Sequence, residues 1–426
     1  DGLGGMSRNC HDFMRDHLIA PKWAKRKRPL LVNSWEAAYF DFNAEKLLRI
    51  AESAAKLGIE MLVLDDGWFG KRNDDRSSLG DWFVNTAKIG ELGELSRRIH
   101  AMGLKFGLWF EPEMVSPDSD LYRKHPEWVL QEPNRRRSIG RSQLMLDLSR
   151  PEVVNYLFDV IAGTLRSAEI EYVKWDMNRN LTEVYSAVLP ADRQMEVAHR
   201  YMLGVYRLHE MLLNEFPELL IEGCSGGGGR FDAGMLAYVP QIWCSDDTDA
   251  MERIPIQLGT SCFYPVSASG AHVSVCPNHI TGRTTPFETR GNIALSGTFG
   301  YELDLSRLSG EEQALVREQV ASYHQYHDII ANGDLYRLTG IFHTDDTLHA
   351  WMYVSKDRKR ALITAVCRTA RPNGFVHFLR PRGLNPEFEY EMDGARISGR
   401  TLMSAGIQVS LKSGDGASRI YLLESR

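Results

Sequence analysis

Two stretches of the sequence carry an apolar run into carboxylates. Residues 172–178 read Tyr-Val-Lys-Trp-Asp-Met-Asn and place Asp176 where a buried strand would end. Residues 241–247 read Gln-Ile-Trp-Cys-Ser-Asp-Asp and repeat the pattern around Asp246. A strand end can present such a side chain to a pocket. Two acids on two strand ends are the minimum equipment for cleaving a glycosidic bond with retention of configuration.

The two acids need different surroundings. A nucleophile must be ionised, and Lys174, two residues before Asp176, can point the same way and hold the anion charged. A general acid must keep its proton near neutral pH, and both the like charge of Asp247 and the apolar cover of Trp243 would raise the pKa of Asp246. The acids fall on the fourth and sixth predicted strands, so an approach of about 5 Å is expected.

Other polar and aromatic residues cluster at the ends of the predicted strands. They are Trp35, Glu36, Asp65, Asp66, Trp68, Trp109, Glu111, Glu113, Lys174, Asn178, Cys224, Ser225 and Asp247. A single buried aspartate is often only a structural hydrogen-bond acceptor. Burying many acids at one edge without a function would be costly, so the cluster indicates a site.

The region from about 30 to 300 alternates short apolar strands with amphipathic helices, which predicts a parallel α/β sheet. The expected strands are 30–36, 61–66, 104–113, 172–178, 219–224, 241–245, 262–266 and one around 293–301. Eight strands with crossover helices predict a (β/α)8 TIM barrel, which places its chemistry at the C-terminal ends of strands. An open doubly wound sheet is the alternative. The GxGxxG motif that would favour it is missing after the first strand.

The pattern of apolar and polar residues changes after a predicted helix at 311–332. Short alternating runs follow at 347–354, 360–366, 375–379, 387–392, 406–411 and 418–423, with turn residues at 371–374 and 413–416 between them. They predict a small antiparallel β-sandwich. We therefore expect a catalytic barrel over residues 1–335 and a sandwich over residues 336–426.

Length and composition narrow the function. A chain of 426 residues usually forms two domains. The formal charge of −6 argues against a nucleic-acid or anionic-membrane partner. We find no signal peptide and no long apolar run, so neither export nor a membrane span is expected. Six cysteines without CxxC spacing fit a reducing cytoplasm. The nine Trp residues suit sugars, although each could simply fill a core.

Residues 225–229, Ser-Gly-Gly-Gly-Gly, have two structural interpretations besides a merely flexible loop. Phosphate binding would need a GK[ST] motif, which is missing. The other interpretation is a backbone that passes close to a ligand, where any Cβ would collide. Acid pairs at strand ends could also hold Mg²⁺, but His272 and His279 lack HxH or HExxH spacing, so no metal and no cofactor is expected.

Four motifs resemble the bacterial α-galactosidases of glycoside hydrolase family 36. They are Lys-Trp-Asp-Met-Asn at 174–178, Asp-Asp-Gly-Trp-Phe-Gly at 65–70, Cys-Ser-Gly-Gly-Gly-Gly-Arg-Phe-Asp at 224–232 and Trp-Cys-Ser-Asp-Asp-Thr-Asp at 243–249. The similarity runs from Gly-Leu-Gly-Gly-Met-Ser-Arg at 2–8 to the last strand, and the motifs keep their order.

The resemblance implies retaining hydrolysis of terminal α-linked galactose, as in melibiose and raffinose, by double displacement. It makes Asp176 the nucleophile and Asp246 the acid/base. The remaining matches imply substrate binding. Asp65 and Asp66 would bind galactose hydroxyls, Trp109 would stack on the sugar, Arg141, Lys174, Asn178 and Cys224–Gly226 (Cys224, Ser225, Gly226) would hydrogen-bond, and Trp35 and Trp243 would line the rim.

Family members normally carry an N-terminal β-sandwich before the Gly2–Arg8 segment, where the given sequence starts. That domain helps to build a homotetramer, so a homo-oligomer is possible. Three other functions stay open: an α-galactosyl transglycosylase, a noncatalytic galactoside-binding protein, and a metal-dependent lyase. Specificity for α-N-acetylgalactosamine would depend on the room that Cys224–Gly226 leaves at C2.

Overall fold

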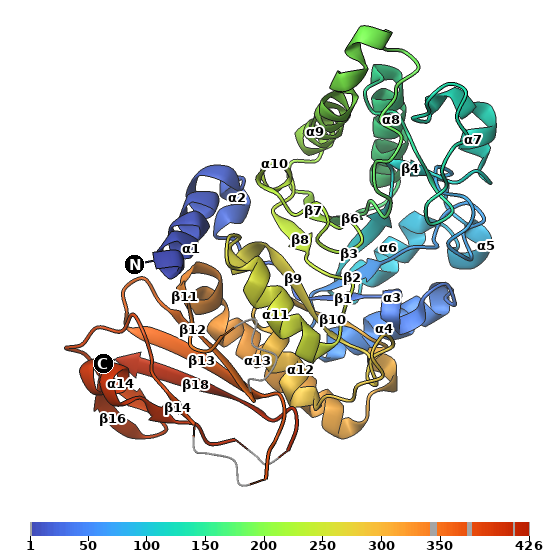
Figure 1. The fold of residues 1–426 in the computed structure, drawn as a ribbon. Coiled ribbons are helices and arrows are strands. Elements are labelled where there is room, and N and C mark those ends of the chain that lie inside the picture. The colour runs from blue at the N-terminus through green and yellow to red at the C-terminus, as the bar shows by residue number, and fades with distance from the viewer. Residues whose placement is uncertain (1, 341–346, 373–376, 412–413, 426) are drawn as a thin grey trace. The chain divides into compact units, whose positions relative to one another are not determined.

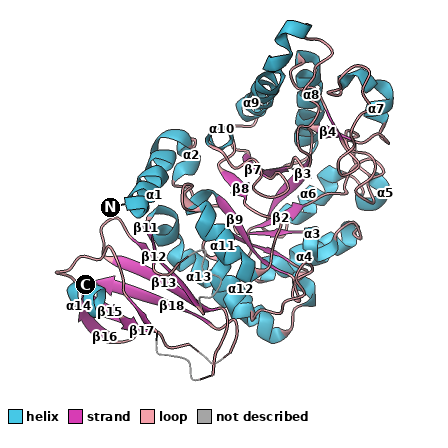
Figure 2. Cartoon of the chain, in the orientation of Figure 1, coloured by secondary structure: helices cyan, strands magenta, loops and turns pink. Residues whose placement is uncertain are grey.

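The computed structural model describes residues 2–340, 347–372, 377–411 and 414–425. Its central feature is a closed barrel with the strand order β1-β10-β9-β8-β7-β6-β3-β2. The neighbouring strands β1, β2, β3, β6, β7 and β8 pair in parallel, as do β9 and β10. The predicted (β/α)8 barrel is therefore confirmed, and Figure 2 shows its strands in magenta.

The barrel strands are short and buried. They are β1 (Leu31–Asn33), β2 (Met61–Leu64), β3 (Lys105–Phe110), β6 (Tyr172–Trp175), β7 (Leu220–Gly223), β8 (Gln241–Trp243), β9 (Ser269–Ser274) and β10 (Thr298–Glu302). Both faces of a barrel strand are covered, so β2 reads as a continuous apolar run, and β1, β3, β6, β7 and β8 each contain at least two apolar residues in succession. Such runs explain why the first six predicted strands overlap the observed ones.

The predicted seventh strand at 262–266 is wrong. Helix α11 (Ala250–Thr260) is followed there by a turn, in which the amide of Cys262 donates to the carbonyl of Gly259 at 2.9 Å. Pro265 has no amide hydrogen for a sheet, and a short 3₁₀ turn follows it. The seventh strand is β9, whose sequence Ser-Gly-Ala-His-Val-Ser has no apolar run. The predicted eighth strand begins too early, because α12 occupies Phe287–Ala294.

Contacts within the chain divide it into two units. One unit comprises Leu31–Trp243 with Leu303–Ser306, and the other comprises Asp1–Leu30, Cys244–Glu302 and Arg307–Arg426. The predicted boundary between residues 335 and 336 stays a prediction.

The first unit holds β1 to β8. Its helices are α3 (Trp35–Ala38), α4 (Ala44–Lys56), α5 (Thr86–Ile89), α6 (Leu92–His100), α7 (Asp120–Lys124), α8 (Pro151–Ser167), α9 (Val197–Glu215) and α10 (Ala233–Leu236). The small strands β4 (Met114–Val115) and β5 (Leu144–Met145) pair antiparallel. Figure 1 shows β6, β7 and β8 side by side, so the segments that follow them emerge at one edge.

Helix α4 illustrates how local sequence sets these elements. The Asn43 side chain caps its start by accepting a hydrogen bond from the Lys46 amide at 2.9 Å. Its apolar residues recur at helical spacing, and the buried ones include Leu47, Ala51 and Ala54. Gly58 then adopts a φ of 83°, which glycine allows without strain, and the chain turns toward β2.

The second unit contains the C-terminal sheet. Its helices are α1 (Gly2–Phe13), α2 (Pro21–Ala24), α11, α12, α13 (Gly310–Asn332) and α14 (Gly399–Ala405). The six-stranded sheet has the order β11-β12-β13-β18-β15-β16, formed by β11 (Asp334–Arg337), β12 (Leu348–Val354), β13 (Arg360–Cys367), β18 (Ser418–Ser425), β15 (Glu389–Met392) and β16 (Ala395–Ser398). A separate two-stranded sheet joins β14 (Phe378–Leu379) to β17 (Ile407–Gln408).

The antiparallel C-terminal part is confirmed, with a period of two along its strands. Ala350 and Met352 face the core shared with β13, whereas the Trp351 side chain lies on the other face and donates to the Ser296 hydroxyl at 2.7 Å. Helix α13 packs against β12 and β13 on this sheet (Figure 1). Parts of the predicted strand at 375–379 and of the turns at 371–374 and 413–416 lie outside the described residues.

Candidate active site

Asp176 follows β6 directly and is only 6% exposed. Its amide donates to the Phe110 carbonyl at 2.8 Å, so the chain keeps its β geometry one residue beyond the strand. The carboxylate accepts a hydrogen bond on each oxygen, from the Met177 amide at 2.9 Å and from the Trp109 indole N–H at 3.3 Å. These two donors fix the direction in which the predicted nucleophile points.

Asp65 and Lys174 form a buried ion pair at the end of β2. The Lys174 ammonium donates to Oδ2 of Asp65 at 2.9 Å, and the Asn33 side chain donates to the same oxygen at 2.7 Å. The other oxygen accepts from the Asp66 amide at 2.9 Å. Residues from β1, β2 and β6 therefore meet at one edge of the sheet. Lys174, expected to hold Asp176 charged, is seen here to pair with Asp65.

Asp66 has a partner that the sequence pattern did not indicate. Arg72, itself 2% exposed, donates from Nη2 and Nε to the Asp66 carboxylate at 2.8 and 3.0 Å. Burial raises the pKa of Asp66, and the Arg72 charge works in the opposite direction. The loop after β2 thus supplies the cation locally, six residues after the acid.

Two buried glutamates follow β3. Glu113 is 0% exposed and accepts two hydrogen bonds from Arg230, at 2.6 and 2.9 Å, with further bonds from the Trp175 indole and the Tyr201 hydroxyl. Burial acts to raise its pKa, but Arg230 and the other donors outweigh burial and lower it. Glu111, 1% exposed, has no such cation, and burial together with the Asp176 charge raises its pKa to about 8.

The glycine-rich segment after β7 is tied to the segment after β6. The Met177 amide donates to the Cys224 carbonyl at 3.0 Å, and the Ser225 hydroxyl donates to the Met177 carbonyl at 3.0 Å. Gly226 is exposed with a φ of 53°, and a Cβ there would lie 4.0 Å from the Asn178 side-chain oxygen. Its backbone conformation therefore favours glycine, whereas a Cβ on Gly229 would collide with the Ser225 carbonyl at 2.6 Å.

The predicted aromatic residues differ in exposure. Trp109 is 2% exposed and stacks on Phe69 with the ring centroids 6.1 Å apart. Trp35 is half-buried, with its ring edge-to-face with Phe40 at 5.3 Å. Trp243 is buried at the end of β8. Arg141 is exposed with a φ of 52°, and no hydrogen bond joins its side chain to any residue that the structure describes.

Asp246 lies three residues after β8 and is exposed. The apolar cover expected from Trp243 is not seen, so the argument that burial holds its proton is wrong for this structure. Its loop is anchored by the Arg253 guanidinium, which donates to the Ser245 carbonyl at 2.8 Å, and by the Cys244 thiol on the Gly270 carbonyl at 3.7 Å. That the Asp246 carboxyl approaches Asp176 stays a prediction.

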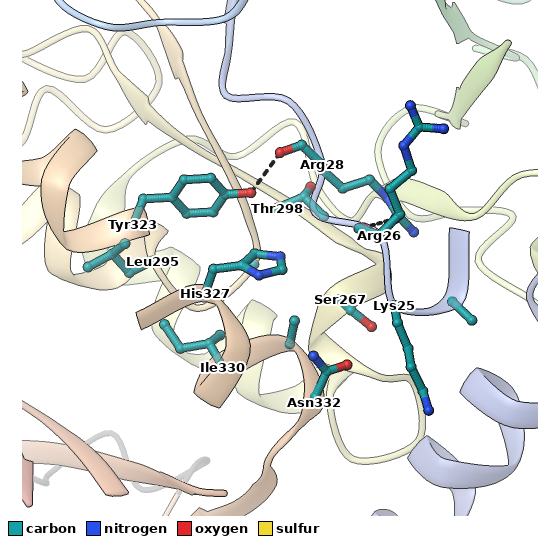
Figure 3. Close-up of a pocket in the computed structure, with 13 residues that line it drawn as sticks. Lys25, Arg26, Arg28, Ser267, Leu295, Thr298, Tyr323, His327, Ile330 and Asn332 are labelled. Carbon is teal, nitrogen blue, oxygen red and sulfur yellow. Dashed lines mark hydrogen bonds between the residues drawn. The ribbon is translucent and has the colours of Figure 1, made fainter. Parts of the chain in front are cut away.

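Two other features lie at the N-terminal ends of barrel strands. A pocket is lined by residues that include Arg28, Thr298, Tyr323 and His327, and the Tyr323 hydroxyl donates to the Arg28 carbonyl at 2.9 Å (Figure 3). No acidic residue is among its described lining, so it does not fit the predicted chemistry. Elsewhere, His100, Glu169 and Glu171 place possible metal-ligand atoms within 4.8 Å of one another just before β6.

Two general expectations can be compared with the structure. In the part of the chain that the structure describes, no helix is long and apolar enough to cross a membrane. The cysteines at 10, 224, 244, 262, 276 and 367 form no disulfide among the described residues.

Comparisons with known proteins give the family. The melibiase family model matches residues 1–333, and the model of the glycosyl hydrolase family 36 C-terminal domain matches residues 348–423. The chain is 50% identical over its full length to the α-galactosidase AgaA of Geobacillus stearothermophilus, and 51% identical over 96% of its length to the bifunctional α-galactosidase/sucrose kinase AgaSK of Mediterraneibacter gnavus. It spans 58% and 43% of those proteins.

Solved structures agree. The crystal structure of the Geobacillus enzyme superposes with a TM-score of 0.98 at 50% identity, covering 100% of this chain and 59% of that one. A variant of the same enzyme, solved in complex with raffinose, superposes with a TM-score of 0.97 at 49% identity over the same shares of the two chains. The chain therefore belongs to the melibiase family, glycoside hydrolase family 36.

Proposed function

We propose that the protein hydrolyses terminal α-linked galactose from oligosaccharides with retention of configuration. The observation that carries the proposal is Asp176, a buried carboxylate whose two oxygens are oriented by the Met177 amide and the Trp109 indole at the end of β6. The relatives named α-galactosidases, and their complexes with raffinose and stachyose, support the choice of substrate.

The chemistry proceeds by two displacements. One oxygen of Asp176 attacks the anomeric carbon while the Asp246 carboxyl gives its proton to the departing glycosidic oxygen. The result is a β-galactosyl ester on Asp176 and a free aglycone alcohol. Asp246, now a carboxylate, removes a proton from water, which attacks the same carbon and breaks the ester bond. α-Galactose leaves, and both acids return to their starting protonation states.

The other predicted residues hold the sugar. Asp65 and Asp66 accept from galactose hydroxyls, Lys174 donates from its position on Asp65, and Trp109 places its ring beside the nucleophile that its N–H contacts. Arg141, exposed in a loop, would have to turn inward to donate. Asn178 and Cys224–Gly226 border the same edge, because their backbones are joined through Met177. Trp35 and Trp243 complete the proposed binding residues.

The test is to trap the ester. A fluorinated galactosyl donor with a good leaving group forms the adduct faster than the adduct breaks down, and peptide mass spectrometry then locates it. We expect one galactosyl group per chain, on the peptide that contains Asp176. A label on another carboxylate, or galactose binding without any label or turnover, would refute the assignment.

A further inference from the structure

Glu111 and Glu113 stand two residues apart after β3, and both are buried, yet they have opposite surroundings. Glu113 is held as an anion by the bidentate Arg230 contact at 2.6 and 2.9 Å. No ion pair joins Glu111 to a cation anywhere in the described ranges. The same strand end thus carries one glutamate with a full countercharge and one without.

The groups around Glu111 are mostly anions and neutral donors. Oε1 accepts a hydrogen bond from the backbone N–H of Asn178 at 2.5 Å, and Oε2 lies 3.1 Å from the Gln143 side-chain nitrogen. The charged groups that act on Glu111 are Asp176 after β6, Asp66 after β2, and Arg72, whose own hydrogen bonds go to Asp66. A second negative charge here would be desolvated and close to the nucleophile, which is strongly unfavourable.

We propose that Glu111 is a positioning residue whose carboxyl group carries a proton in the working enzyme, so that it holds the Asn178 amide in place without adding a second charge beside Asp176. The inference rests on the proposed role of Asp176. Burial, followed by the Asp176 charge, raises the pKa of Glu111 to about 8, so the proton stays on at neutral pH.

The proton has an acceptor within reach. Oε1 already accepts from Asn178, so the hydroxyl is Oε2–H, which faces the Gln143 amide. In the structure, the nitrogen of that amide donates to Oε2 and its oxygen is buried without a hydrogen-bond partner, so reversing the amide brings the oxygen beside Oε2 and puts the NH2 group in the unpartnered position. Oxygen and nitrogen of a glutamine are interchangeable in the same atomic positions. With the amide reversed, Oε2–H donates to the Gln143 oxygen, and Glu111 bridges the segment after β6 to the residue before β5.

The first experiment measures the charge. Binding of a permanently cationic, N,N-dialkylated galactose-configured iminosugar is measured from about pH 5 to about pH 9 with wild type and Glu111→Gln, beside neutral galactose. Lys88, whose pKa burial lowers to about 8, also titrates in this range but is shared by both proteins. As the pH rises through about 8, we expect the affinity of wild type for the cation to increase about tenfold more than the affinity of the variant does.

Galactose, being neutral, should show no difference in this step between the two proteins. An equal gain for the cation in both proteins would overturn the proposal, because the step would then belong to another group. A galactose affinity that changes with pH in wild type alone would also overturn it, by pointing to a change of shape in place of a change of charge.

The second experiment measures positioning. Glu111→Gln keeps a neutral acceptor for the Asn178 amide, whereas Glu111→Leu is similar in size and removes it. On an aryl α-galactoside with a good leaving group, kcat/KM of the glutamine variant should exceed that of the leucine variant by about 10- to 100-fold, the cost of displacing the Asn178 segment that borders the site. Equal values would overturn the positioning role.

The outcomes separate the two proposals. If Glu111→Leu does not fold, the titration of wild type against Glu111→Gln still decides. If wild type cleaves no aryl α-galactoside, the proposed function fails, while the binding titration still shows whether Glu111 carries the proton.

Discussion

The Glu111 carboxyl also makes the stability of the folded chain depend on pH, in a direction that follows from its surroundings. An unfolded glutamate ionises near the ordinary pKa of 4.5, whereas burial and Asp176 raise the pKa of Glu111 to about 8 in the folded chain. Between these values the folded chain keeps a proton that the unfolded chain has lost. The contribution of Glu111 to stability is therefore full below pH 4.5 and is lost as the pH rises to about 8.

The magnitude follows from that interval. The difference, 8 − 4.5 = 3.5 pH units, is worth on the order of 3–5 kcal/mol at about 1.4 kcal/mol per unit. Urea denaturation of wild type and Glu111→Gln, followed by tryptophan fluorescence at several pH values, measures it, because other titrating groups cancel in the difference. As the pH rises from 4.5 to about 8, we expect the unfolding free energy of the variant to increase relative to that of wild type by up to about 1.4 kcal/mol per pH unit. A difference that does not change with pH would refute the reasoning.

Glu113→Gln is the matched control, since it changes the same group two residues along the chain. Burial acts to raise the Glu113 pKa, but Arg230 lowers it overall, so this carboxylate contributes stability above its unfolded pKa that is lost as the pH falls. The variant leaves the Arg230 guanidinium, whose side chain is only 11% exposed, without its carboxylate partner, which costs about 3–5 kcal/mol at neutral pH. The difference in unfolding free energy between wild type and Glu113→Gln should be constant above about pH 5 and become smaller in acid. Its pH dependence therefore has the opposite sign to that of Glu111→Gln.

Three further results are expected. Asp176→Asn should lower kcat more than about 10⁴-fold and abolish the trapped adduct, and retained labelling would contradict its role. Asp246→Asn should slow raffinose hydrolysis about 10²- to 10⁴-fold but affect a dinitrophenyl galactoside much less, and equal losses would contradict acid catalysis. EDTA should leave hydrolysis unchanged, since every proposed step uses protein carboxylates, and a loss restored by added metal would point to the lyase-type alternative instead.

The sequence predicted the parts of the fold that depend on local patterns. Runs such as Met61–Leu64 are apolar because both faces of the strand are covered, and the acids that follow them mark the strand ends. Strand β9 could not be predicted in this way, because its neighbours provide the burial and its own residues are small or polar. The exposure of Asp246 was equally hidden, since it depends on how a loop is anchored by Arg253 and not on adjacent residues.

The ionisation of each acid could not be predicted from the sequence pattern either, because it depends on partners from other parts of the chain. Glu111 and Glu113 look equivalent in Phe-Glu-Pro-Glu-Met, and both follow the same strand. What distinguishes them is Arg230, which is 117 residues away in the chain and reaches only Glu113. A partner as near as Arg72 was also missed, because an arginine six residues after an acid carries no signal of its own.

A charge balance connects these contacts to the chemistry. Five buried carboxyl groups follow β2, β3 and β6, namely Asp65, Asp66, Glu111, Glu113 and Asp176. Lys174, Arg72 and Arg230 each neutralise one of them, and the proton proposed on Glu111 neutralises a fourth. Asp176 is then the one carboxylate of this group without an ion pair among the described residues, and its contacts there are the N–H groups of Trp109 and Met177. In the proposed mechanism an anionic Asp176 faces an electron-poor carbon, and the proton proposed on Glu111 keeps a second desolvated negative charge away from that nucleophile.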